Sequence, residues 1–153
     1  MKNLLLIPAI LASLVAAAIA QAPTAALAGG IGNNYIAPSV TFGGRQTAFT
    51  VDGKFGIADN ISLRPYVYFP SEGIQFGSSV TYDWDLRQAS LPITPFIGLG
   101  ALFQTGLNTS TVYAQVGADF NISENIALVA EVAIPFSSDN FFVGVTLGAG
   151  LRF

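Results

Sequence analysis

The chain contains 153 residues, of which 6 are Lys or Arg, 9 are Asp or Glu, and none is His or Cys. Only 10% of the residues are charged and 52% are hydrophobic, whereas an average globular protein carries about 25% charged residues. The missing Cys and His exclude disulfides, thiolate sites, His-dependent catalytic triads and His-ligated metals, and the net charge of −3 argues against a nucleic-acid-binding surface.

The N-terminal segment has the pattern of a secretory signal peptide. A positively charged start precedes an apolar run from Leu4 to Ala20, which is shorter than the ~20 residues that a membrane-spanning helix needs. Small residues favour cleavage after Ala28, with cleavage after Ala20 as the alternative. We therefore expect a signal peptide at residues 1–28 and a single domain at residues 29–153.

Hydrophobic alternation predicts β-strands throughout the rest of the chain. Between Phe49 and Ile57, for example, apolar residues alternate with polar ones such as Asp52 and Lys54. The first strand contains Pro38, which cannot donate a ladder hydrogen bond, so we expect imperfect pairing there. Eight alternating segments are expected, at residues 35–42, 49–57, 61–69, 74–84, 97–103, 112–120, 126–134 and 141–153. An even number of antiparallel strands closes a barrel with both ends of the chain on one side.

Alternation alone does not say which face points outward, because a soluble lipocalin-like barrel has the same pattern with an apolar interior. Nearly all strand charges share one face, and they are too few to cover an exterior. The same face is rich in glycine, which suits the narrow interior of an eight-stranded barrel. We therefore expect a lumen charge network of Asp52, Lys54, Arg64, Asp83, Asp119, Glu131 and Arg152, with Tyr66, Tyr68, Tyr113 and Gln115 as hydrogen-bond partners.

Aromatic residues on the apolar face gather near the strand ends. One group contains Phe55, Tyr82, Trp84, Phe120 and Phe153, and the other contains Phe42, Phe49, Phe69 and Phe103. This distribution is typical of the two aromatic girdles of membrane barrels. The sequence therefore predicts an all-β fold, an eight-stranded antiparallel up-and-down transmembrane β-barrel.

The last strand resembles the C-terminal signal of bacterial outer-membrane barrels, through Thr146, Gly148, Leu151 and Phe153. Residues 93–100 and 117–128 resemble a central strand and a strand–turn–strand of the OmpA-type small outer-membrane barrels. The resemblance implies an outer-membrane location with both termini in the periplasm. It also implies that the barrel assembly machinery recognises the last strand.

Catalytic chemistry has little support in this chain. The small barrels that modify lipids rely on a Ser–His relay, which a chain without His cannot form. Asp83, Asp85 and Asp119 offer carboxylates for a divalent cation, but hard cations need six or more oxygens and the sequence has no dense group of them. We expect no enzyme activity, no cofactor and no metal site.

The lumen charges permit two functions. In the first, the charge network plugs the lumen of a structural protein that stabilises the outer membrane. In the second, re-pairing of the network opens a small porin-like channel. A soluble lipocalin-like carrier is the alternative from a different class. We expect the first function for a monomer whose partners are outer-membrane lipid and the assembly machinery, without nucleic acid.

Overall fold

The computed structural model describes residues 34–43, 46–71, 73–84, 86, 91–105, 109–136 and 144–153. The expected signal peptide and both of its cleavage sites lie outside these residues. Eight strands are present: β1 (Tyr35–Gly43), β2 (Gln46–Ala58), β3 (Ile61–Phe69), β4 (Gln75–Asp83), β5 (Ile93–Gln104), β6 (Thr109–Asn121), β7 (Ile126–Pro135) and β8 (Gly144–Arg152). Each one overlaps a segment that alternation predicts. Within the described ranges, no helix is long and apolar enough to cross a membrane.

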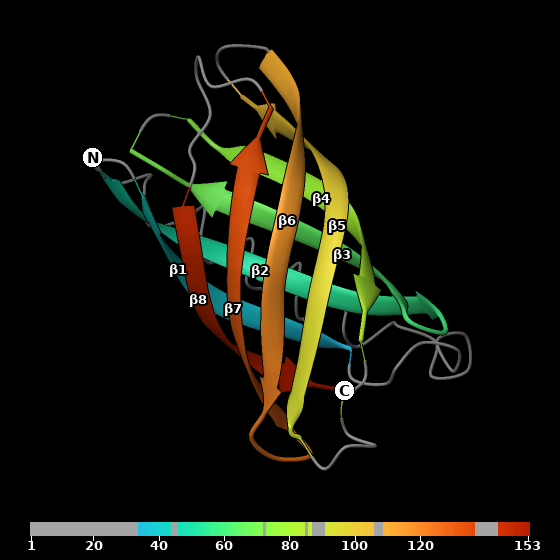
Figure 1. The fold of residues 1–153 in the computed structure, drawn as a ribbon. Helices are drawn as coiled ribbons and strands as arrows, with labels where there is room; N and C mark the ends of the chain where they lie inside the picture. Colours follow the sequence, from blue (N-terminus) through green and yellow to red (C-terminus); the bar gives the residue numbers. More distant parts are fainter. Residues whose placement is uncertain are drawn as a thin grey trace.

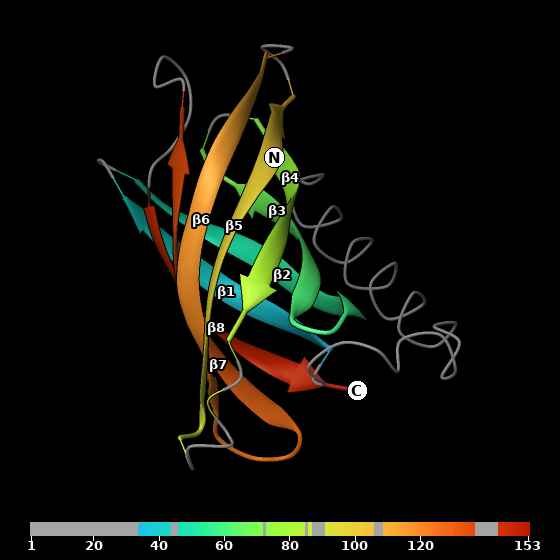
Figure 2. The same ribbon diagram turned by 45° about the vertical axis from the view of Figure 1, so that its right-hand side comes forward.

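The eight strands form one closed antiparallel barrel in which each strand pairs with its neighbours in sequence and β1 pairs with β8. Figures 1 and 2 show the strands tilted around a common interior. Tyr35 of β1 lies opposite Arg152 of β8, so the first strand begins where the last strand ends. We call this the terminal end, and the end near Gly43 and Pro135 the opposite end. The predicted fold class is confirmed.

The first strand is paired unequally on its two sides. Against β2, its ladder is continuous from Tyr35 to Gly43. Against β8, the ladder skips Ala37 and Pro38. Proline has no backbone N–H to donate, which limits its pairing on one side. The expected imperfect pairing at Pro38 is therefore confirmed, and it is confined to the β1–β8 seam.

Most large apolar side chains of the described strands face outward, and most of the polar side chains face the lumen. Leu99 on the outer face is 59% exposed, whereas the inward-facing Lys54 and Asp119 are 3% and 2% exposed. Each of the eight strands carries large hydrophobic side chains that are exposed on the outer face. Such a surface suits contact with lipid rather than water. This orientation is the reverse of a lipocalin-like barrel, whose interior is apolar.

Aromatic side chains form a belt at each end of the outer face. Near the opposite end, the ring centroids of Phe49 and Phe69 are 6.0 Å apart and those of Phe76 and Phe103 are 5.7 Å apart. Near the terminal end, the ring centroids of Phe55 and Phe153 are 6.2 Å apart and those of Tyr82 and Trp84 are 5.1 Å apart. Such pairs contribute roughly 0.5–1.5 kcal/mol each beyond their buried area. The two expected girdles are therefore present, and the Phe49–Phe69 and Phe76–Phe103 pairs also join neighbouring strands.

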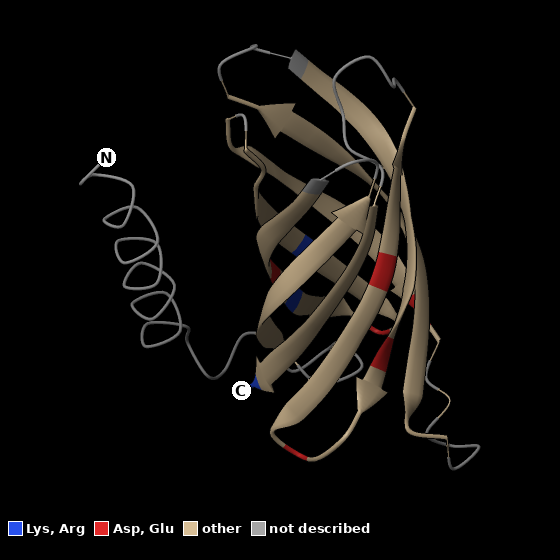
Figure 3. Cartoon of the chain, turned by 90° about the vertical axis from the view of Figure 1, so that its left-hand side faces the viewer, with Lys and Arg blue, Asp and Glu red and all other residues tan. Residues whose placement is uncertain are grey.

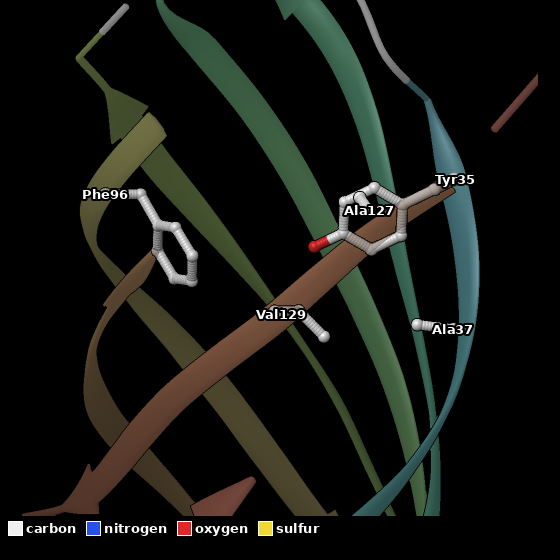
Figure 4. Close-up of a cluster of buried hydrophobic side chains, with 5 residues drawn as sticks. All are labelled: Tyr35, Ala37, Phe96, Ala127 and Val129. Atoms are coloured by element: carbon white, nitrogen blue, oxygen red, sulfur yellow. The ribbon is translucent and has the colours of Figure 1, made fainter. Parts of the chain in front are cut away.

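Glycines on the inner face make room for aromatic rings that cross the lumen. A Cβ atom on Gly100 would lie 2.5 Å from Tyr113 Cζ, and one on Gly117 would lie 2.5 Å from Phe96 Cζ. Any side chain at these positions would displace the ring. Figure 4 shows Phe96 and Tyr35 pointing into the interior from different strands, within a cluster completed by small apolar side chains.

Candidate functional site

Four charged side chains meet inside the barrel toward the terminal end. Lys54 Nζ lies 2.9 Å from Asp83 Oδ2 and 2.8 Å from Asp119 Oδ2. Arg64 Nη2 lies 3.4 Å from Asp83 Oδ1 and 2.9 Å from Asp119 Oδ2. All four side chains are at most 3% exposed, so this ion cluster is buried and formally neutral. Figure 3 shows the charged segments of the strands in the half of the barrel toward the C-terminus and in its middle.

Two aromatic residues complete the ion cluster from further strands. The Tyr35 hydroxyl donates to Asp119 Oδ1 over 2.8 Å and accepts a hydrogen bond of the same length from Arg64 Nη1. The guanidinium also lies over the Phe96 ring, with Arg64 Cζ 3.5 Å from the ring centroid. A desolvated cation over a ring gains about 2 kcal/mol or more. Six strands therefore hold the cluster in place, since β1 and β5 join the four that carry the charges.

Hydroxyl groups donate further hydrogen bonds to both carboxylate oxygens of Asp83. Ser62 Oγ donates to Asp83 Oδ2 over 2.6 Å, and Thr81 Oγ1 donates to Asp83 Oδ1 over 2.9 Å. Arg64 Nε in turn donates to Thr81 Oγ1 over 3.1 Å. Buried ion pairs are stable only when hydrogen bonds satisfy their remaining donors and acceptors. The described residues around Asp83 meet that condition.

Glu131 and Asp52 lie in the lumen outside the ion cluster. Glu131 Oε2 accepts a hydrogen bond of 2.6 Å from Gln115 Nε2, and Gln115 Oε1 accepts one from Ser79. Asp52 is 5% exposed, and its Oδ2 atom has no hydrogen-bond partner among the described residues. Neither carboxylate forms one of the described ion pairs. The lumen thus has a paired layer of charge and, beside it, two carboxylates without a cation.

These two carboxylates line the same cavity of about 30 Å³, whose walls extend from the middle of the barrel toward the opposite end. Neutral polar and aromatic side chains form most of its other walls, among them Thr50, Tyr66 and Tyr113. The Tyr66 and Tyr113 rings meet edge to face with centroids 5.6 Å apart.

The remaining expected site residues lie elsewhere. Arg152 donates to the Ser123 carbonyl over 2.7 Å and to the Asn121 side chain, at the rim of the terminal end and away from the ion cluster. Asp85 lies outside the described residues, and Asp83 is already engaged in the cluster. No group of three or more His, Cys, Asp or Glu side chains that could hold a metal occurs in the described part of the chain.

Of the hydrogen-bond partners expected from the sequence, Gln115 bonds Glu131, while Tyr66, Tyr68 and Tyr113 line the cavity. Sequence reasoning missed Tyr35, Phe96, Ser62 and Thr81 as parts of the ion cluster. A signal existed for Tyr35, because its position in the alternation of β1 is that of inward-facing Ser39 and Thr41. Nothing in the sequence shows that these neutral side chains touch charged ones.

The four residues of the expected assembly signal have definite places in the closed barrel. The Thr146 hydroxyl is hydrogen-bonded to Thr41 at 2.7 Å across the β1–β8 seam, and Gly148 leaves room for the Ser39 side chain. Leu151 and Phe153 face outward, 67% and 46% exposed. The inward pair therefore packs at the β1–β8 seam, and the outward pair is exposed on the outer face.

The comparisons with known proteins bear on the fold. No protein-family model and no curated protein matches the chain in sequence. A de novo designed transmembrane β-barrel superposes with a TM-score of 0.62 at 17% identity, covering 80% of this chain and 96% of the designed one. This chain has the fold of a small transmembrane β-barrel. The N-terminal β-barrel domain of Pseudomonas aeruginosa OprF is similar with a TM-score of 0.58 at 15% identity, covering 79% of this chain and 97% of that domain. The resemblance to the small outer-membrane barrels is therefore confirmed at the level of the fold.

Proposed function

We propose that this chain is an integral outer-membrane protein with a structural, non-enzymatic role, and that the ion cluster plugs its lumen. The main observation in support of this proposal is the buried network of ion pairs among Lys54, Arg64, Asp83 and Asp119. The apolar outer face and its two aromatic belts support insertion in lipid. The expected assembly machinery acts, in this proposal, on the outward side chains of the last strand.

The proposed plug rests on the number of strands whose side chains the ion cluster joins across the lumen. Its charges come from β2, β3, β4 and β6, and Tyr35 and Phe96 add β1 and β5. A hydrated ion passing the terminal end would have to separate at least one of these pairs. Breaking a buried pair costs about 3–5 kcal/mol, which would make such openings rare.

The orientation of the barrel is part of the proposal. The resemblance to bacterial outer-membrane barrels, whose even strand number puts both termini on the periplasmic side, assigns the terminal end, where β1 begins and β8 ends, to the periplasm. Turn length does not carry this assignment, because the connections are residues 59–60, 84–92 and 122–125 at the terminal end and residues 44–45, 70–74, 105–108 and 136–143 at the opposite end.

Conductance in planar lipid bilayers tests the plug. Wild-type barrels are expected to give no resolvable current steps. A double variant, Arg64→Ala with Asp119→Ala, removes one cation and one carboxylate, keeps the cluster neutral and is expected to conduct. Its folding is checked first by heat-modifiable migration in detergent gels. Regular current steps from the wild type would contradict the plug and support the porin-like channel instead.

Membrane extraction tests the location. The proposal expects the protein in the outer-membrane fraction after washing with high salt and with alkaline carbonate. Release by either wash would contradict the integral location and support the soluble carrier. A cytoplasmic control protein and a known integral barrel, processed in parallel, calibrate the fractionation.

A further inference from the structure

Two buried carboxyl groups in the middle of the barrel have no cation of their own. Asp52 and Glu131 are 5% and 7% exposed. The two cations buried in the described part of the lumen, Lys54 and Arg64, already balance the two carboxylates of the ion cluster. A buried carboxylate without a cation is costly, and such a group becomes neutral by binding a proton instead.

The two carboxyl groups also share one space. Asp52 from β2 and Glu131 from β7 line the same cavity. Asp52 Oδ2 has no hydrogen-bond partner among the described residues, and Glu131 Oε2 accepts a hydrogen bond of 2.6 Å from the neutral amide of Gln115. Two negative charges in one cavity would repel each other as well as lose their hydration. The geometry therefore favours a proton on this carboxyl pair.

The titratable groups around the carboxyl pair do not offset its charge. Phenols face it from two strands, since Tyr66 and Tyr68 of β3 and Tyr113 of β6 line the cavity. A phenol stays neutral up to about pH 10. The walls from β4, β5 and β8 contribute Gln75, Leu102 and Thr146, which do not titrate. Toward the terminal end, the pair meets the ion cluster, which is formally neutral and consists of Lys54, Arg64, Asp83 and Asp119, with Tyr35 of β1 bonded to it.

We propose that Asp52 and Glu131 form a pH-sensitive switch in a chain without histidine. The folded barrel retains a proton on this pair at neutral pH, and loss of the proton in alkaline solution weakens the barrel. The cavity walls extend to Thr41 and Pro135 near the opposite end, so the proton exchanges with the solution on that side. The inference holds whether or not the ion cluster blocks conductance.

The composition of the chain makes the switch measurable. Unperturbed Asp and Glu ionise near about pH 4, Tyr and Lys near about pH 10, and the chain has no His and no Cys. Between about pH 6 and pH 8, the unfolded chain therefore has ionised carboxylates, while the folded barrel keeps a proton on the carboxyl pair. Because the folded state then binds more protons, its stability falls as the pH rises. Each retained proton raises the unfolding equilibrium constant about tenfold per pH unit.

Urea unfolding at a series of pH values tests the switch. Wild-type barrel in a zwitterionic detergent, followed by the emission of its single Trp, is expected to show at least a tenfold rise in the unfolding equilibrium constant between about pH 6 and pH 8. A double variant, Asp52→Asn with Glu131→Gln, carries neutral amides of the same shape and is expected to lose this rise. A smaller rise in the wild type, or an equal rise in the double variant, would overturn the proposal.

A matched control is available in exposed turns. The double variant Asp59→Asn with Glu124→Gln makes the same chemical changes outside the lumen. It is expected to keep the pH dependence of the wild type. Loss of the pH dependence in this control would assign the effect to surface charge and overturn the proposal.

A second measurement keeps the test valid if the lumen variant fails to fold. In the infrared spectrum, the C=O stretching band of a protonated carboxyl group is separate from the bands of carboxylates. Folded wild-type barrel at about pH 7 is expected to show this band and to lose it by about pH 10, where an unperturbed carboxyl is fully ionised. Absence of the band at neutral pH, or its persistence in alkaline solution, would overturn the switch without bearing on the proposed plug.

Discussion

Replacing Asp119 by Asn is the sharpest test of the ion cluster. The Asp119 carboxylate accepts hydrogen bonds from Tyr35 and Lys54, each 2.8 Å long, and two from Arg64, 3.1 and 2.9 Å long. Asn keeps the shape of the side chain but removes the charge and one acceptor oxygen. Its amide N–H groups then face cationic donors, and the cluster is left with one excess positive charge.

Burial decides the size of the effect. An exposed ion pair contributes about 0–1 kcal/mol, whereas removing one partner of a buried pair costs about 3–5 kcal/mol. The Asp119 and Lys54 side chains are each 3% exposed, so the buried value applies. We expect Asp119→Asn to lower the free energy of unfolding by about 3–5 kcal/mol, a change of roughly 10²–10⁴ in the equilibrium constant.

Trp84 provides the assay. It is the single Trp of the chain, it follows Asp83 directly, and it is 42% exposed on the outer face. Its emission should shift when the barrel leaves the lipid or detergent on unfolding. Urea titrations of wild type and variant, read by this emission and by heat-modifiable gel migration, give the difference in free energy of unfolding.

Two further variants make the result decisive. Asp59→Asn, in the exposed turn between β2 and β3, makes the same chemical change and should cost under about 0.5 kcal/mol. Lys54→Met combined with Asp119→Leu should recover much of the loss, since apolar side chains often replace a buried pair at little cost. If Asp119→Asn costs no more than Asp59→Asn, the lumen is hydrated and the argument from burial is refuted.

Three other predictions concern different parts of the barrel. Tyr35→Phe removes a hydroxyl that joins Asp119 to Arg64 and should cost about 1–3 kcal/mol in the same titration; an unchanged midpoint would show that water replaces the hydroxyl. Gly100→Ala places a Cβ 2.5 Å from Tyr113 Cζ and should cost about 1–3 kcal/mol, more than Gly53→Ala, whose nearest neighbour is the outward Phe55 ring at 3.0 Å. Leu99→Arg, on the outer face in mid-strand, should cost about 2–4 kcal/mol in lipid vesicles, against about 0–1 for Ile122→Arg at the terminal end; equal losses would contradict the assigned membrane position.

The strands and their faces were predictable because both are local properties. In a strand, successive side chains point to opposite faces, so the alternation from Phe49 to Ile57 marks both the strand and its two sides. The uneven distribution of charge then identified the inward face. Even the break at Pro38 followed from the residue alone, although its restriction to the β8 side did not.

The partners within the lumen were only partly predictable. Seven charged residues were expected on one face, and the structure brings four of them into direct contact. Glu131 lies instead on a hydrogen-bonded chain through Gln115, and Arg152 lies at the rim. Tyr35 and Phe96 were not expected in the cluster, since a neutral side chain carries no charge pattern that marks its partner.

The sequence by itself determined the number of strands, their inner and outer faces, the two aromatic belts and the absence of His-based chemistry. Only the tertiary structure decided which inward residues meet, because that depends on the register between strands and on the closure of β1 against β8. Closure brings Asp52 and Glu131, from opposite halves of the chain, to one cavity and leaves them without a cation. Alternation has a period of two residues, so it assigns each side chain to the inner or the outer face. A contact across the lumen also requires that the two residues lie at the same level along the barrel axis and on strands close enough to meet.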